Sequence, residues 1–242
     1  MIFIFLSLIV ITILVVSFCV FFDQARLTRK ETIYQLPTLQ KKIAITFDDG
    51  PSPIWTPLIL DELKKSDVKA TFFMIGHHVQ KYPHIARRVV EEGHAIGNHG
   101  YAHSVILYYT QAEIEEEIKY TEHVIKNVTG KTTTMYRPPK AWMTKSIKQK
   151  IKDIGYDVVL WSLNSKDWAG FPPQFITDHL VRSVKGGDII LFHDSGNVLK
   201  AEGGDRSRTV KAVGYLIREL HKKGFEFVTV EELLHSAQSK ET

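Results

Sequence analysis

The chain has 242 residues, 44% of them hydrophobic and 24% charged, which predicts a globular protein with one sizeable core in one or two domains. Its net charge of +4 and pI near 9.0 favour anionic surroundings such as wall polymers or lipid head groups, but no block of Lys and Arg resembles a nucleic-acid-binding patch. The single cysteine, Cys19, excludes an intrachain disulfide.

An apolar segment at the N-terminus, residues 2–22, contains no charged residue. As a helix rising about 1.5 Å per residue, it matches the roughly 30 Å hydrocarbon core of a bilayer. We therefore expect residues 1–22 to form a single membrane span. A cleaved signal peptide is the alternative, although the segment has no basic N-terminal region and no small-x-small cleavage site.

Residues 23–41 are polar, carry Pro37 and show no sustained period, which suits a linker between the membrane and a folded domain. We expect that domain to cover residues 42–236 and a polar tail to follow at residues 237–242. Basic residues follow the apolar segment and none precedes it, so the positive-inside rule would hold the domain in the cytoplasm. That orientation conflicts with the extracytoplasmic function inferred below.

Apolar runs and helical apolar stripes alternate along the domain. Strands are predicted at residues 43–48, 70–75, 94–98, 134–136, 157–162, 188–192 and 225–230. Helices are predicted at residues 55–66, 83–92, 110–130, 144–154, 174–184, 209–223 and 231–236. Thr110 and Glu113 suit a capping box, and Pro83 fits a first helical position. This alternation predicts an α/β fold of parallel strands with right-handed crossovers.

Polar clusters follow most of the predicted strands. They are Asp48-Asp49, His99 with His103, Arg137, Asp167-Trp168 and His193. In a barrel of parallel strands the loops that follow the strands share one face, and active sites are built on that face. We therefore expect these side chains to meet at the carboxyl ends of the strands.

One of the two adjacent carboxylates, with His99 and His103, forms a candidate metal site. Alone, Asp-Asp-Gly is typical of a turn, and two histidines four residues apart are typical of a helix surface. Together, a carboxylate and two histidines fill three positions around a zinc-like ion and leave one for water or substrate, as in catalytic sites. Non-haem iron oxygenases use the same ligand types, but their usual jelly-roll fold does not alternate strands with helices.

Such an ion lowers the pKa of a bound water toward about 7 and polarises a carbonyl oxygen, which suits hydrolysis of an amide or ester. The reaction also needs a base for the water and an acid for the leaving group. Asp48 and His193 suit these two roles. Arg137 could hold Asp48 ionised, and Asp167 could fix the tautomer of His193 and raise its pKa.

Five motifs in a fixed order carry a resemblance to a known family. They are Thr46-Phe47-Asp48-Asp49-Gly50, His99-x3-His103, Arg137-Pro138-Pro139, Asp167-Trp168 and Leu191-Phe192-His193-Asp194. Over residues 40–235 the chain resembles the polysaccharide deacetylase family with the NodB homology domain, carbohydrate esterase family 4. The resemblance implies an irregular (β/α) barrel of about seven parallel strands and metal-dependent removal of N-acetyl groups from N-acetylglucosamine polymers.

The resemblance also implies roles for single residues. Asp48 would be the base and His193 the acid. Arg137 would tune Asp48, and Asp167 would tune His193. One divalent ion would be held by Asp49, His99 and His103. Zinc is the expected ion, and cobalt, nickel and manganese are the alternatives. The substrate-binding residues would be Pro139, Lys140, Trp168 and Leu191. Trp168 and Leu191 would line a pocket for the acetyl methyl group, and the Lys140 amide would help to hold the oxyanion.

By the same resemblance, the substrate is an acetylated glycan of the cell wall, with peptidoglycan first and chitin-like oligomers as related substrates. The catalytic domain would then lie outside the cell, tethered by residues 2–22 as a single-pass membrane protein, or secreted if that segment is cleaved. We expect a monomer that binds no nucleic acid.

Four residues depart from the family pattern: Gly100, Ser104, Lys140 and Asn164. None is an expected ligand, acid or base, so we expect the chemistry to survive. Lys140, however, puts a cation where a flat ring would pack against sugar. Two alternatives therefore stand beside the deacetylase: a wall-glycan-binding homologue with impaired catalysis, which these departures favour, and an esterase that acts on polysaccharide O-acetyl groups with the same site.

Overall fold

The structure, a computed structural model, describes residues 2–23, 25, 28–36, 40–196 and 204–238. Its centre is a sheet of parallel strands in the order β5-β4-β3-β2-β1-β7-β6, and an eighth strand, β8, pairs with the start of β1. The strands are β1 (Lys42–Asp48), β2 (Thr71–Met74), β3 (Ala95–Asn98), β4 (Met135–Tyr136), β5 (Asp157–Val158), β6 (Leu163–Asn164), β7 (Ile189–His193) and β8 (Glu226–Phe227). The prediction of about seven parallel strands in an α/β fold is confirmed.

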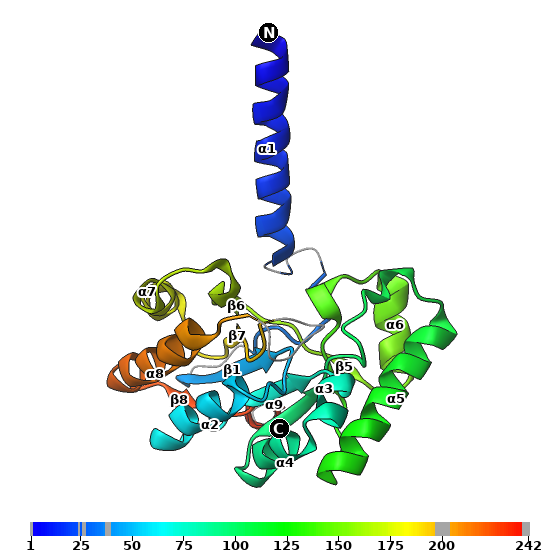
Figure 1. The fold of residues 1–242 in the computed structure, drawn as a ribbon, viewed down its shortest axis with the longest axis vertical. Helices are drawn as coiled ribbons and strands as arrows, with labels where there is room; N and C mark the ends of the chain where they lie inside the picture. Colours follow the sequence, from blue (N-terminus) through cyan, green and yellow to red (C-terminus); the bar gives the residue numbers. More distant parts are fainter. Residues whose placement is uncertain (1, 24, 26–27, 37–39, 197–203, 239–242) are drawn as a thin grey trace.

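Helices surround this sheet, as Figure 1 shows. They are α2 (Trp55–Lys65), α3 (Gly76–Lys81), α4 (Pro83–Glu91), α5 (Gln111–Thr129), α6 (Lys145–Asp153), α7 (Pro173–Ser183), α8 (Ser207–Lys222) and α9 (Val230–Gln238). Thr110 and Glu113 make the predicted capping box, and Gly130 ends α5 in the left-handed conformation. The short helix α3 was not predicted, because six residues give too little helical pattern.

The side chains of β1 alternate between two hydrophobic clusters. Ile43, Ile45 and Phe47 belong to the cluster that includes the apolar faces of α2 and α8. Ala44 belongs to the second cluster, on the other face of the strand. Because side chains alternate along a strand, Thr46 and Asp48 share the face of Ala44. The same period places Leu191 and His193 together on the inner face of β7.

The sheet does not close into a complete barrel by strand pairing. Its edge strands β5 and β6 are not neighbours in the described hydrogen-bond ladder. The segment predicted as one strand, residues 157–162, instead crosses the opening: the Val159 amide donates to Tyr136 O (2.9 Å), the Leu160 amide to Ile33 O (2.7 Å) and the Ser162 amide to Ile189 O (3.0 Å). Each part of this segment therefore has a different partner, which splits the predicted strand.

Part of the predicted linker belongs to the folded unit. Ile33 and Gln35 form isolated bridges with Val159 and Asp188, one on each side of the opening in the sheet. Lys148 Nζ also donates to the carbonyl of Lys30 (2.7 Å). Residues 30, 33 and 35 therefore contact the folded domain, although they lie before the expected boundary at residue 42. The polar composition of residues 23–41 masked the short apolar pattern of Ile33, Tyr34 and Leu36, which pack against the second cluster.

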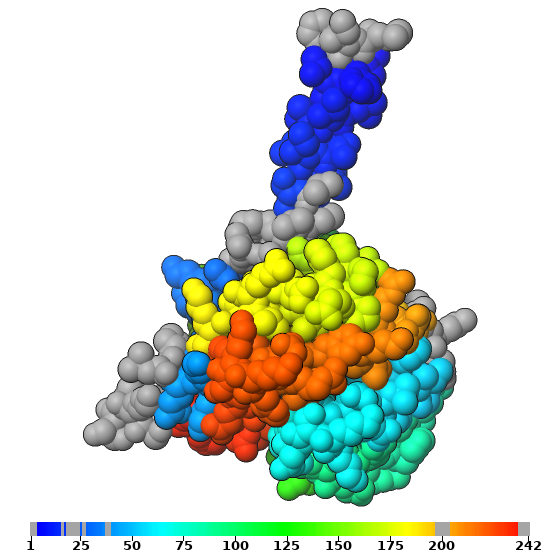
Figure 2. Space-filling view, turned by 90° about the vertical axis from the view of Figure 1, so that its left-hand side faces the viewer, coloured from blue at the N-terminus to red at the C-terminus, as the bar shows by residue number. Residues whose placement is uncertain are grey.

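Helix α1 (Ile2–Asp23) projects from the domain in Figures 1 and 2 and contacts it at the turn η2 (Pro139–Ala141). Its described side chains, those of residues 4–15 and 17, are exposed; Ile4 and Phe5, for example, are both 67% exposed. Within the part of the chain that the structure describes, no helix has the length and apolarity needed to cross a membrane. The membrane span over residues 1–22 stays a prediction.

Candidate active site

Asp48 and His193 lie side by side at the carboxyl ends of two adjacent strands. They are direct partners in the parallel register of β1 and β7. The Asp194 amide continues this register by donating to the Asp48 carbonyl (3.0 Å). Residues 145 positions apart in the sequence thus share the same end of the sheet, as the barrel argument predicted.

Asp49 turns away from the strand and toward two histidines. Its φ of 77° is left-handed, a conformation that is uncommon for a non-glycine residue and typical of sites where function imposes it. Asp49 Oδ1 lies 3.4 Å from His99 Nε2 and 3.3 Å from His103 Nε2. The carboxylate and the two imidazoles therefore converge, as predicted.

The tautomer of His99 follows from its second contact. His99 Nδ1 lies 2.6 Å from the carbonyl oxygen of Arg137, and a carbonyl can only accept a hydrogen bond. Nδ1 therefore carries the proton, and the lone pair of Nε2 points toward Asp49. A backbone carbonyl bound to the second ring nitrogen is the usual support of a metal-ligating histidine.

The three side chains fit a divalent cation. Their ligand atoms all lie within 4.8 Å of one another, and Asp49 Oδ1 is buried and accepts no hydrogen bond from the described residues. Burial opposes ionisation of Asp49, but His99, His193 and His103 hold its pKa well below the usual range. Burial lowers the pKa of His103 to about 3, and the neighbouring His99 adds to this effect. An ionised carboxylate with a neutral imidazole is the protonation state that metal binding requires.

Arg137 is fully buried and all of its nitrogens are used. Nη1 donates to Asp48 Oδ1 (2.7 Å) and Thr46 Oγ1 (2.8 Å), while Nε and Nη2 donate to the carbonyls of Val159 and Leu160, both at 3.0 Å. Burial lowers the pKa of Arg137, and Asp48 opposes that effect. The arginine thus ties Asp48 to the segment that crosses the opening of the sheet.

Asp167 orients His193 through two contacts. Its Oδ1 lies 2.8 Å from His193 Nδ1, and its Oδ2 accepts from the His193 amide (3.0 Å). The hydroxyls of Ser165 (3.1 Å) and Thr209 (2.8 Å) also donate to this carboxylate. Burial opposes protonation of His193, but the adjacent Asp167 raises its pKa above the ordinary value.

The four predicted substrate-binding residues differ in exposure. Leu191 is only 2% exposed and lies two residues before His193 on the same strand face. Trp168 follows Asp167 and is 53% exposed. Pro139 is buried and Lys140 is exposed in the turn η2 (Pro139–Ala141). Their roles in binding a ligand stay a prediction.

Two of the departures from the family pattern have a local explanation. Gly100 has a φ of 76°, and a Cβ there would lie 3.1 Å from Glu117 Oε1, so glycine avoids strain between the two histidines. Asn164 Oδ1 accepts from the Lys166 amide (2.8 Å), which shapes the loop before Asp167. Neither departure disturbs the candidate ligands.

The sequence reasoning missed four supporting residues. Thr46, Ser165 and Thr209 hydrogen-bond Arg137 or Asp167. The fourth is Asp194, whose Oδ2 accepts from Thr56 (2.6 Å) and whose pKa burial raises to about 7. Thr209 lies 42 residues from Asp167 and has no local signal. Asp194 was named within the fifth motif, but no role was predicted for it.

An open barrel of parallel strands, with a cluster that could hold a cation beside a carboxylate and a histidine, is typical of a hydrolase. Residues 35–159 match the family described as polysaccharide deacetylase, and the chain belongs to that family. The resemblance inferred from the motifs is confirmed.

Relatives cover most of the chain. A peptidoglycan-N-acetylglucosamine deacetylase of Bacillus cereus is 40% identical over 207 residues, which cover 83% of this chain and 92% of the relative. The crystal structure of the Bc1960 peptidoglycan N-acetylglucosamine deacetylase matches with a TM-score of 0.77 and 32% identity, over 83% and 91% of the two chains. The structure of BA3943 from Bacillus anthracis, described as a CE4 family pseudoenzyme, matches with a TM-score of 0.74 and 25% identity, over 83% and 68%.

Proposed function

We propose that the protein hydrolyses N-acetyl groups on N-acetylglucosamine units of cell-wall polysaccharide, with peptidoglycan as the substrate. The observation that carries the proposal is the convergence of Asp49, His99 and His103 within 4.8 Å, beside Asp48 and His193 paired on adjacent strands. The relatives named as peptidoglycan deacetylases support the choice of substrate.

Asp49, His99 and His103 would hold one divalent metal, for which zinc suits the carboxylate and two imidazoles. When bound, such an ion polarises a carbonyl oxygen and acidifies water. This chemistry suits attack on an acetyl group, whose amide carbon is a weak electrophile.

Asp48 would act as the base. Its Oδ1 is engaged by Arg137, and its Oδ2 lies 3.8 Å from His99 Nε2, on the side of the candidate ligands. Oδ2 can therefore take a proton from the attacking water, while Arg137 keeps the carboxylate in position. The water oxygen forms a bond to the acetyl carbon.

His193 would act as the acid. With Nδ1 bound to Asp167, its Nε2 is the nitrogen left for the substrate. Nε2 would donate its proton to the glucosamine nitrogen as the carbon–nitrogen bond breaks, which yields acetate and a free amine. Trp168 and Leu191 would enclose the acetyl methyl group, and Pro139 and the Lys140 amide would complete the pocket.

Acetate release tests this function. Purified protein supplied with zinc should release acetate from N-acetylglucosamine oligomers and from peptidoglycan, and a chelator should abolish the release. Release from O-acetylated substrates alone would show an esterase instead. Glycan binding with no release from any acetylated sugar would contradict the proposal and favour an inactive homologue.

We also propose that residues 2–22 tether the domain to the outer face of the cell membrane. The support is the absence of charge over this segment and the exposure of the described apolar side chains of α1. The full-length chain should then sediment with membranes and be degraded by protease added to intact protoplasts. A chain lacking residues 1–22 should remain soluble. Protection of the full-length domain from the added protease would contradict this placement.

A further inference from the structure

The turn η2 exposes one cation beside the candidate active site. Pro139 and Ala141 are buried, and only Lys140 between them is exposed. Lys140 and Ala141 have left-handed φ values of 60° and 55°, which cost free energy in non-glycine residues and persist only where the surrounding structure imposes them. The shape of the turn therefore fixes where the lysine leaves the backbone.

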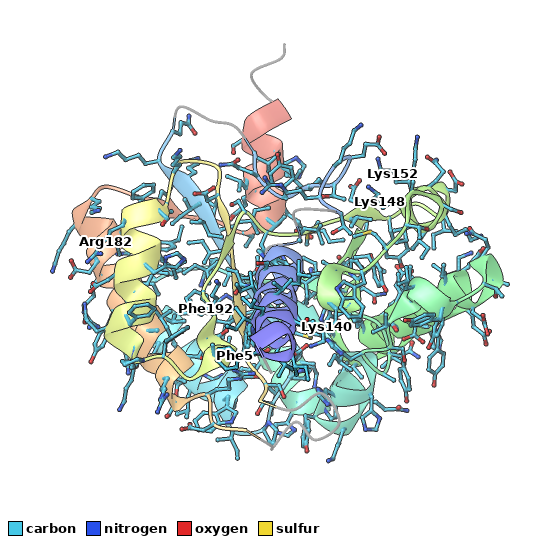
Figure 3. All side chains as sticks on the ribbon, turned by 90° about the horizontal axis from the view of Figure 1, so that it is seen from above. Phe5, Lys140, Lys148, Lys152, Arg182 and Phe192 are labelled. Atoms are coloured by element: carbon cyan, nitrogen blue, oxygen red, sulfur yellow. The ribbon has the colours of Figure 1, made fainter. Side chains whose placement is uncertain are left out.

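This turn is joined directly to the candidate ligands. Arg137, three residues before Lys140, contacts His99 through its carbonyl and Asp48 through its guanidinium. A Cβ on Gly100, the residue after His99, would lie 3.9 Å from Pro139 Cγ. Lys140 thus stands on the rim of the site, next to the loop that carries the histidines. Helix α1 contacts η2, and Lys140 is labelled beside this helix in Figure 3, which looks down on the domain.

The charge of Lys140 is unused by the described protein. Within the described residues its ammonium group makes no ion pair and no hydrogen bond, whereas Lys119 and Lys150 both pair with Glu115. Two further cations close to the site are buried and engaged: Arg137 pairs with Asp48, and Arg206 donates to the Ser195 carbonyl. A carboxylate on the ligand can pair with this ammonium group of Lys140, because no described carboxylate of the protein does so.

We propose that Lys140 binds a carboxylate of the glycan, so that the enzyme prefers acidic acetylated chains to neutral ones. This inference rests on the proposed function. The ligand chemistry is a carboxylate within one sugar of the scissile acetyl group, and the lactyl group of N-acetylmuramic acid supplies it in peptide-free strands. In strands that carry peptides, the carboxylates of the peptide stem are the other possible ligand for Lys140. An ammonium–carboxylate contact of this kind is a charge-assisted hydrogen bond.

The test compares substrates that differ only in charge. Peptide-free oligomers of N-acetylglucosamine and N-acetylmuramic acid are assayed beside the same oligomers with the lactyl carboxyl converted to a methyl ester. Wild-type enzyme should show a kcat/KM ratio, acid over ester, of about ten, the size of one charge-assisted hydrogen bond in a partly exposed site. The ratio should fall toward one at high salt.

Three variants identify the residue responsible. Lys140→Gln should bring the ratio to about one, mainly through KM, and Lys140→Arg should keep it. Lys131→Gln removes an exposed lysine from the loop after α5. This variant should keep the wild-type ratio of kcat/KM, acid over ester. A third substrate consists of peptide-bearing strands whose lactyl carboxyl is blocked. If the preference for these strands also depends on Lys140, the inference holds and the peptide stem supplies the carboxylate.

The outcomes separate the inference from the proposed function. Acetate release by wild-type enzyme with equal kcat/KM for acid and ester, and no preference for peptide-bearing strands, would overturn the inference alone. A ratio that collapses equally in Lys140→Gln and Lys140→Arg would also overturn it, because the shape of the turn and not the charge would then be responsible. No acetate release from any substrate would overturn both.

Discussion

Replacing Asp48 with Asn should lower kcat for acetate release by about 10²- to 10⁴-fold, the range that a positioned general base contributes. The amide has the shape of the carboxylate, and its oxygen can still accept from Arg137 Nη1, which now contacts Asp48 Oδ1 at 2.7 Å. It cannot take a proton from water. Metal content should stay unchanged, because Asp49 and not Asp48 lies between the two histidines.

A matched variant is available on the surface. Asp157→Asn alters an exposed carboxylate at the start of β5 and should leave kcat within about twofold of wild type, as ordinary surface substitutions have small effects. A kcat for Asp48→Asn close to that of this control would remove Asp48 from the mechanism.

Replacing Arg137 with Leu should destabilise the protein by about 3–5 kcal/mol, as expected when one partner of a buried ion pair is removed. The change leaves the Asp48 carboxylate buried without its cation, and it leaves the carbonyls of Val159 and Leu160 without their donors. Urea unfolding followed by circular dichroism measures the loss.

A surface control and a double variant sharpen this prediction. Arg88→Leu breaks contacts with Asp61 and Glu92 and should cost about 1 kcal/mol or less, because such pairs near the surface contribute little. Removing both charges, in Arg137→Leu with Asp48→Leu, should cost less than the sum of the two single changes. A single Arg137→Leu as stable as wild type would contradict the role given to this ion pair.

The sequence predicted local elements well where their signals are local. The capping box at Thr110 and Glu113 formed, and the carboxyl ends of the strands brought Asp49, His99 and His103 together. These three side chains converge as predicted because parallel topology places those loops on one face.

Features that depend on distant partners were not predictable from local pattern. Whether residues 157–162 form one strand depends on Ile33, which lies more than a hundred residues away and occupies part of the opening. The support given to Asp167 by Thr209 likewise comes from a different helix. A hydroxyl on a helix carries no sign in the sequence of the carboxylate that it will meet.

The most direct test of the account is a zinc titration of protein stripped with a chelator and dialysed. We predict that calorimetry detects one zinc ion per chain, that acetate release returns in proportion to the zinc bound, and that His99→Ala with His103→Ala abolishes both. Full acetate release by the stripped protein, or undiminished zinc binding by the double variant, would contradict it.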